Sequence, residues 1–316
     1  MSSFLEKLNK VGGMKLVKQY AKSGVLSVAI AEILEMGTSQ KALEILRLSV
    51  QYKIEKRLRK EFGYILEQYK DNNLPQKQSN KVWICWLQGI ENAPLLVKRC
   101  YHSLLKHMHD REVIVLTEDN IKNFVDIPEY IKELLNSGKM TKTFFSDILR
   151  LEILLKYGGL WLDATVLCTS DDIPSYIFDS ELFLYQVLKP GRDGHVVNIS
   201  SWLISSCTNN RVLRVTLDMI YAYWKKYDFL MDYGLLHMFM CIALDYFEED
   251  CKKIPKFCNS IPHILLLEAF EPFDAKNYEI IKGMTCFHKL SDKRPVELLT
   301  RKGTYYDFIV NRGIEE

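Results

Sequence analysis

The stretch TKTFFSDILRLEILLKYGGLWLDATVLCT, residues 141–169, decides the fold. Its first half has apolar residues at helical spacing, and the pair Gly158-Gly159 ends that helix. The apolar run that follows predicts a buried strand, in which Asp163 is the one acid. A buried carboxylate needs a partner, because an unpaired buried charge is costly. The stretch therefore predicts a helix, a tight turn and a strand that delivers an acid.

Two charged residues share a face of the predicted helix. Asp147 and Arg150 are three residues apart, so their side chains are neighbours. On an otherwise apolar helix this pair is either a structural ion pair or part of a site. Ser146 is expected to cap or interrupt the same helix.

On both sides of this stretch, short apolar runs alternate with helical patterns. Strands are expected at 81–89, 112–117, 182–187 and 196–206, and helices at 94–109, 128–138, 209–227 and 231–248. This alternation predicts a mostly parallel sheet with helices on both faces. Ligands of such sheets bind beyond the carboxyl ends of the strands, where Gln88 and Asp163 are expected. The sequence contains neither Gly-x-Gly-x-x-Gly nor a Walker motif.

The first quarter of the chain has a different character. Helices are expected at 3–22, 24–36 and 40–70, the last capped by Ser39. A polar segment with Pro75 then predicts a linker, so the expected domains are a helical segment, 1–75, and a main domain, 80–316.

Basic residues are concentrated in the same quarter of the chain. Residues 1–80 carry 14 Lys/Arg against 8 Asp/Glu, although the whole chain has a net charge of only +2. These helices are either a small bundle with a solvated charged face or a basic surface held against an anionic membrane.

Composition narrows the class of protein. The chain has 316 residues, 48% of them hydrophobic, which is enough for a large core. Its eight cysteines form no Cys-x-x-Cys motif and are expected to be reduced core residues of a cytosolic protein. No signal peptide and no run of about 18 apolar residues is visible, so we expect a cytoplasmic protein. Nucleic-acid binding is not supported, because basic and aromatic residues are not interleaved.

The block from Ser146 to Thr165 resembles the sugar-donor motif of glycosyltransferase family thirty-two, and most closely its bacterial capsular-polysaccharide branch. The resemblance covers roughly residues 80–295. It implies an α/β fold of GT-A type, a Rossmann-like mixed sheet flanked by helices, to which the N-terminal helices are an appendage. It also implies a nucleotide-sugar donor, a divalent cation (Mn²⁺ or Mg²⁺) and retention of anomeric configuration.

Position in that motif implies roles for five residues. Asp163 is the first acid of the D-x-D motif and is expected to reach the metal and the donor diphosphate. Thr165 stands where the second acid is expected, and it either holds a metal-bound water or only fills the strand. Asp147 corresponds to the acid that accepts hydrogen bonds from the sugar, and Arg150 to an arginine near the sugar and diphosphate. Trp161 is either an aromatic wall at the donor or a core residue.

Shorter matches add further donor-site residues. Trp83 or Trp86, on the first strand, is expected to face the nucleotide base, with Gln88 at the strand end. The pair His288-Lys289 resembles a late element that supplies a metal ligand and a phosphate contact.

Three further residues complete the expected site. Lys293 is an equal candidate to Lys289 for contact with phosphate. Asp232 and His237 are expected on one helix, where they either bind the acceptor and assist proton transfer or form a surface pair.

The function expected is retaining transfer of a hexose, galactose or glucose, from a UDP-sugar to a polyprenyl-diphosphate-linked saccharide in capsular or exopolysaccharide synthesis. The protein is expected at the inner face of the cell membrane, bound through its N-terminal helices. Cations stabilise the charge that develops on the leaving diphosphate, and this phosphate can take the acceptor's proton, so no separate base is needed. The alternative is a non-catalytic nucleotide-sugar-binding scaffold, because the second acid is missing.

Overall fold

The computed structural model describes residues 13–71, 74–189 and 194–314. A five-stranded sheet at its centre has the strand order β2-β1-β3-β6-β5. The strands are β1 (Lys81–Cys85), β2 (Glu112–Leu116), β3 (Gly159–Leu162), β5 (Leu182–Gln186) and β6 (Ile199–Ser206). Two shorter strands, β4 (Val166–Cys168) and β7 (Phe287–Lys289), pair with each other beside this sheet.

The central sheet is mixed. β1 runs parallel to β2 and β3, whereas β6 runs antiparallel to both β3 and β5. A mixed α/β sheet flanked by helices was expected. The expectation of mostly parallel pairing is wrong for the β6–β5 side, where the chain returns across the sheet.

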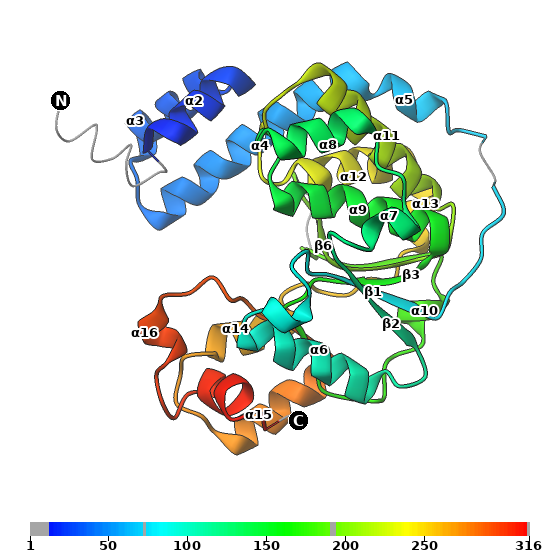
Figure 1. The fold of residues 1–316 in the computed structure, drawn as a ribbon. Helices are drawn as coiled ribbons and strands as arrows, with labels where there is room; N and C mark the ends of the chain where they lie inside the picture. The colour runs from blue at the N-terminus through cyan, green and yellow to red at the C-terminus, as the bar shows by residue number, and fades with distance from the viewer. Residues whose placement is uncertain (1–12, 72–73, 190–193, 315–316) are drawn as a thin grey trace.

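Helices cover both faces of the sheet (Figure 1). One face carries α7 (Ile121–Phe124), α8 (Glu129–Asn136), α9 (Lys142–Tyr157), α11 (Arg211–Lys226), α12 (Leu235–Tyr246) and α13 (Glu248–Lys253). On the other side lie α6 (Leu95–His107), α14 (Ile264–Glu268), α15 (Ala275–Met284) and α16 (Val296–Leu299). The short α10 (Tyr176–Asp179) precedes β5.

The alternation of side chains along β1 separates two cores. Val82 and Ile84 pack in the core on the α6 side, and Trp83 packs in the core on the α9 side. Trp83 is fully buried there, in contact with the rings of Phe124 and Tyr157. Its indole N–H donates to the carbonyl of residue 158 at 2.9 Å. The expectation that Trp83 faces a nucleotide base is therefore wrong. Side chains alternate along β1, and this alternation buries Trp83 between the sheet and α9.

Thr141 caps the N-terminus of α9. Its hydroxyl accepts a hydrogen bond from the Phe144 N–H at 3.1 Å. Ser146 lies inside the helix, where its hydroxyl donates to the Thr143 carbonyl at 2.7 Å. The expected cap at Ser146 is wrong, and the helix begins a turn earlier.

The turn between α9 and β3 depends on Gly159. Its φ is +97°, in the left-handed region, and a Cβ there would lie 2.3 Å from the Lys81 carbonyl oxygen. Only glycine lets β3 approach β1 this closely. The turn therefore sets the position of β3 and of Asp163, which follows it.

The N-terminal helices are α2 (Gly13–Ser23), α3 (Leu26–Met36), α4 (Gln40–Phe62) and α5 (Tyr64–Glu67). Ser39 caps α4 as predicted, accepting from the Ala42 N–H at 3.2 Å. The predicted helix from residue 3 begins outside the described residues. The buried face of α4, including Ile54 and Leu58, belongs to the same core as α11 and α12. A continuous core thus crosses the predicted domain boundary.

Residues 74–80 connect α5 to β1 without regular structure. Lys77 and Thr208 exchange two hydrogen bonds of 3.0 Å, which fasten this connection to the turn before α11. The eight cysteines are free thiols. Within the described parts of the chain, no helix is long and apolar enough to span a membrane.

Candidate functional site

Asp163 follows β3 directly, at the carboxyl end of that strand. Its backbone N–H donates to the Trp202 carbonyl at 2.8 Å, and its carbonyl accepts from the Val166 N–H at 3.1 Å. These bonds hold the turn between β3 and β4. The carboxylate is one-third exposed, so it is available to a ligand.

Four charged side chains meet at this turn. Arg150 donates to Asp147 at 2.8 Å and to Asp163 at 3.0 Å. The Lys289 ammonium lies 3.4 Å from the other oxygen of Asp163. One helix, one strand end and β7 therefore supply a linked cluster of two carboxylates and two cations.

Arg150 is the buried centre of this cluster. Its side chain is 4% exposed, and its guanidinium carbon lies 5.1 Å from the centre of the Trp161 ring. Burial raises the pKa of Asp147 to about 6; the Arg150 charge lowers that pKa and the Asp163 charge adds to the rise. Asp147 consequently changes charge close to physiological pH.

Lys289 reaches the cluster from β7. Pairing of β7 with β4 sets Lys289 opposite Val166, and its ammonium donates to the Thr165 hydroxyl at 2.6 Å. The Thr165 hydroxyl thus binds the Lys289 ammonium group and is not free to bind a metal-bound water. A carboxylate at this position would pair with the same ammonium group.

The residues predicted as metal ligands do not come together. His288 is fully buried, and its Nε2 lies 3.1 Å from the Thr169 hydroxyl. Side chains alternate along a strand, so His288 points away from the side on which Lys289 contacts Thr165. Within the described residues no group of three His, Cys, Asp or Glu side chains could hold a metal ion. This set does not fit a cation bound by three protein side chains, and the assignment of His288 is corrected.

A cavity of about 560 Å³ opens over the cluster. We call it the Lys289 cavity. It is lined by ten of the predicted residues, which are Trp86, Gln88, Asp147, Arg150, Trp161, Asp163, Thr165, His237, Lys289 and Lys293. Trp86, one of the two candidates for contact with the base, lines this cavity, and Trp161 forms both cavity wall and core.

Asp232 lies elsewhere. It does not line the Lys289 cavity but an adjoining one. The helix expected over 231–248 begins at Leu235, so Asp232 and Tyr233 precede α12 and do not share a helix face with His237. His237 is neutral at pH 7, because burial lowers the pKa of its imidazole to about 4 and the Arg150 charge adds to this effect.

Sequence reasoning missed other residues of the Lys289 cavity. Ser201 on β6, Tyr233 before α12 and His263 before α14 all line it. Each comes from a different element far along the chain, and no local spacing connects them. The strand expected at 196–206 contains Ser201, but its position beside Asp163 depends on the pairing of β6 with β3, which no local pattern indicates.

Two known proteins are similar to parts of this chain. The chain is similar to the O-glycosyltransferase PaGT of Phomopsis amygdali, at 27% identity over 168 residues that cover 48% of this chain and 40% of that protein. It thus spans about two-fifths of the length of that curated relative. The solved PaToxG glycosyltransferase is similar over 66% of this chain and 83% of its own, with 13% identity and a TM-score of 0.38, too low to carry a conclusion.

A family match covers much more of the chain. Residues 37–309 match the family described as capsular polysaccharide synthesis protein. This range takes in α4, the whole sheet, the charged cluster and β7. The chain therefore belongs to the capsular polysaccharide synthesis protein family.

Proposed function

We propose that this protein is a glycosyltransferase that moves a hexose from a nucleotide sugar to a saccharide acceptor. The linked cluster of Asp147, Arg150, Asp163 and Lys289 at the sheet edge carries the proposal. Membership of the capsular polysaccharide synthesis family and similarity to an O-glycosyltransferase support it. The finer proposals are a GT-A fold, kinship with family thirty-two, a UDP-linked galactose or glucose donor, and retention of configuration.

The charges of the Lys289 cavity suit a nucleoside diphosphate. Lys289 and the exposed Lys293 both line the cavity and can neutralise the diphosphate as the glycosidic bond breaks. Arg150 is bound to both carboxylates and keeps them in place. Asp147 uses one oxygen for Arg150, and its other oxygen has no partner among the described residues, so it can accept from a sugar hydroxyl.

Proton transfer needs no additional base. In front-face substitution the leaving phosphate takes the proton of the acceptor hydroxyl while the new bond forms on the same face of the sugar. His237 lines the cavity in its neutral form, so it is a second group that can hold that proton.

The divalent cation is proposed to bind only together with the donor diphosphate. Asp163 is the one predicted carboxylate ligand, and it already contacts two cationic side chains. Mg²⁺ and Mn²⁺ accept a single protein carboxylate when phosphates and water complete the shell. We therefore expect a cation to bind with the donor and not to the free protein.

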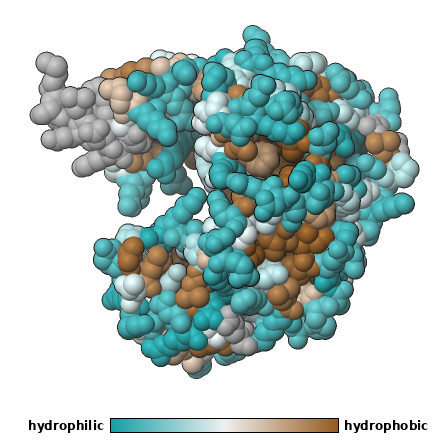
Figure 2. Space-filling model, in the orientation of Figure 1, coloured by the Kyte–Doolittle hydropathy of each residue, from teal (hydrophilic) through white to brown (hydrophobic). Residues whose placement is uncertain are grey.

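The N-terminal helices support a proposal for the acceptor and the location. Lys15, Lys18 and Lys41 are exposed there together with Met14 and Leu34, the latter 73% exposed. Figure 2 shows apolar residues on the outer side of these helices next to hydrophilic ones. This pattern suits attachment to an anionic membrane, so a polyprenyl-diphosphate-linked acceptor at the cytoplasmic membrane face is proposed.

A thermal-shift screen of nucleotide sugars tests the donor. UDP and at least one UDP-sugar should raise the unfolding temperature by several degrees, because a ligand that binds only the folded state stabilises it. Lys289→Met should reduce this shift. Lys276→Met removes the same charge from an exposed position on α15, outside the cavity, and should not reduce it.

A measurement of UDP-sugar hydrolysis distinguishes an active glycosyltransferase from a non-catalytic scaffold. With Mn²⁺ present, slow hydrolysis of the binding UDP-sugar is expected, and Asp163→Asn should abolish it. Full activity in that variant contradicts the assignment. Donor binding without turnover on any acceptor pool favours the non-catalytic scaffold.

A further inference from the structure

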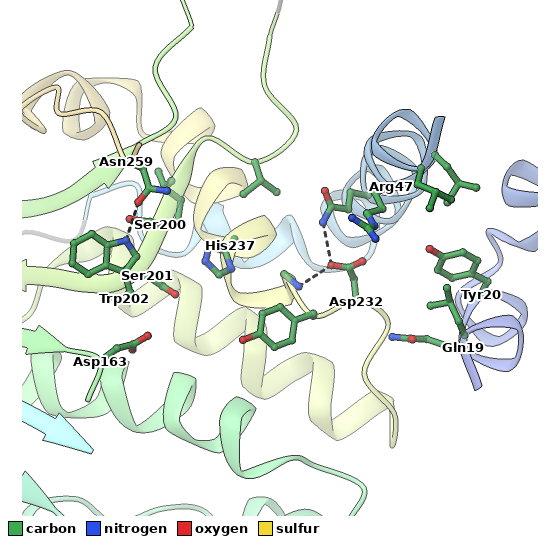
Figure 3. A pocket seen from close by; sticks show the side chains of 18 residues that line it. Gln19, Tyr20, Arg47, Asp163, Ser200, Ser201, Trp202, Asp232, His237 and Asn259 are labelled. Carbon is green, nitrogen blue, oxygen red and sulfur yellow. Dashed lines mark hydrogen bonds between the residues drawn. The ribbon is translucent and has the colours of Figure 1, made fainter. Parts of the chain in front are cut away.

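A second cavity, of about 620 Å³, adjoins the Lys289 cavity. We call it the Arg47 cavity. Gln19 and Tyr20 of α2 and Arg47 and Gln51 of α4 line one side. Strand β6, the Asp232–Gly234 loop and Asn259 line the other side. Figure 3 shows Arg47 and Gln19 on helices across the cavity from Asp163 and Trp202. The N-terminal helices are thus a wall of this space.

The two cavities meet at the proposed reaction centre. Asp163, Ser201, Tyr233 and His237 line both of them. His237 also has a buried Nδ1 without a hydrogen-bond partner among the described residues. A buried imidazole nitrogen without a partner is unusual, and a ligand hydroxyl is a partner that would satisfy it. A molecule in the Arg47 cavity can therefore reach the sugar held in the Lys289 cavity.

Polar groups of the Arg47 cavity are held in fixed positions. The Asp232 carboxylate accepts from the Gly234 N–H at 2.7 Å and from the Gln51 amide at 3.3 Å through the same oxygen. The other oxygen of Asp232 has no partner within the described residues. The Gln19 amide donates to the carbonyls of residues 230 and 231 at 3.0 and 3.2 Å. Fixed carboxylate and amide groups in a large pocket suit a ligand with several hydroxyls.

Trp202, which is 5% exposed, forms part of the cavity wall beside these groups. The Trp202 indole N–H donates to Asn259 at 2.8 Å, and its ring stacks on Tyr185 with ring centres 5.0 Å apart. This ring cannot turn without losing both contacts. This part of the cavity wall is therefore rigid.

Arg47 gives the cavity its charge preference. It makes no hydrogen bond or ion pair with another described residue, although Asp232 lines the same cavity. An unpaired guanidinium binds phosphate or carboxylate through two parallel hydrogen bonds.

We propose that the Arg47 cavity binds the acceptor, a saccharide that carries an anionic group, and that the N-terminal helices select it through Arg47. The inference rests on the proposed glycosyltransferase function. The nucleophilic hydroxyl lies between Asp163 and His237, and the anionic group lies at Arg47. The anion is either the phosphate of a glycosyl phosphate or the carboxylate of an acidic sugar.

Three small probes test the inference by ligand-observed NMR with UDP present at saturation. They are glucose 1-phosphate, methyl glucuronoside and the neutral methyl glucoside. At least one anionic probe should bind roughly tenfold more tightly than methyl glucoside. The better of the two identifies the source of the charge. In Arg47→Gln this preference should disappear. Lys53→Gln removes the same charge from an exposed position of α4 that does not line the cavity, and should keep it.

Three results overturn the inference, and the first two concern the comparison of probes and of variants. One is equal binding of the three probes to the unmodified protein. The other is an equal effect of Arg47→Gln and Lys53→Gln. Displacement of the probes by UDP places them in the Lys289 cavity and also refutes the inference. If the unmodified protein binds neither UDP nor any nucleotide sugar, the proposed function fails instead, so the two failures are distinct.

Discussion

Asp147 and Asp163 are two carboxylates in contact with one guanidinium, and they differ in exposure. The Asp147 side chain is 13% exposed and the Asp163 side chain is 32% exposed. Desolvation therefore acts mainly on Asp147 and brings its pKa to about 6. The buried carboxylate of Asp147 can therefore lose its charge at mildly acidic pH.

This difference predicts a pH dependence of donor binding. Above pH 6 Asp147 is ionised and accepts a charge-assisted hydrogen bond from the donor sugar, and below pH 6 it is neutral. The affinity gained by UDP-sugar over UDP should therefore fall by roughly fivefold between pH 7.5 and 5, because a bond to a charged group is about 1 kcal/mol stronger than a neutral one. Calorimetry at both pH values measures the ratio. Asp147→Asn should give a ratio that does not change with pH, and a wild-type ratio that does not change contradicts the role of Asp147.

Sequence analysis predicted the parts of the site that lie close together in the chain. The three-residue spacing of Asp147 and Arg150 predicted their ion pair, which the structure has at 2.8 Å. It failed where strand geometry decides. His288 and Lys289 are adjacent on β7, so their side chains point to opposite sides of the strand. Only one of the two can therefore reach Asp163, and it is Lys289. The strand itself is only three residues long and carries no clear period.

At the scale of elements, the site depends on the α9–β3 turn, because this turn connects the helix that carries Asp147 and Arg150 to the strand that precedes Asp163. The sequence predicted the helix, the glycine pair and the strand in the correct order, because the periods 3.6 and 2 are both visible. It could not predict that β6 would run antiparallel to β3, because pairing direction depends on a long connection outside any local pattern. Element boundaries near α12 were displaced for a similar reason, since the apolar pattern continues into the preceding loop.

Gly159→Ala should destabilise the protein by about 2 kcal/mol or more. The left-handed backbone and the close Lys81 carbonyl both oppose a Cβ at this position. Urea unfolding measures the change. Gly283→Ala is the matched control, because this helical glycine has open space around it and should gain about 0.5 kcal/mol. Equal stability of the two variants would show that the turn tolerates a side chain.

At the scale of the whole molecule, the exposed apolar positions of α3 predict binding to anionic vesicles. The protein should float with vesicles that contain phosphatidylglycerol and not with purely zwitterionic ones, because basic side chains attract an anionic surface. Leu34→Glu should weaken flotation. Leu267→Glu, at an equally exposed leucine on α14, is the control. If both variants float like the unmodified protein, the α3 face does not contact the membrane.

The shared core of α4, α11 and α12 also has a consequence for synthesis on the ribosome. Residues of α4 are made first, yet their partners on α11 and α12 follow more than 150 residues later. At a translation rate of about 5–20 residues per second, the partners of α4 on α11 and α12 are synthesised roughly ten seconds or more after α4 itself. Helix α3 can cover part of α4 at once, but the part that faces α11 and α12 stays exposed and aggregation-prone during that interval. The nascent chain is therefore expected to depend on chaperones or on early membrane contact more than a protein whose N-terminal helices bury all of their apolar surface against one another.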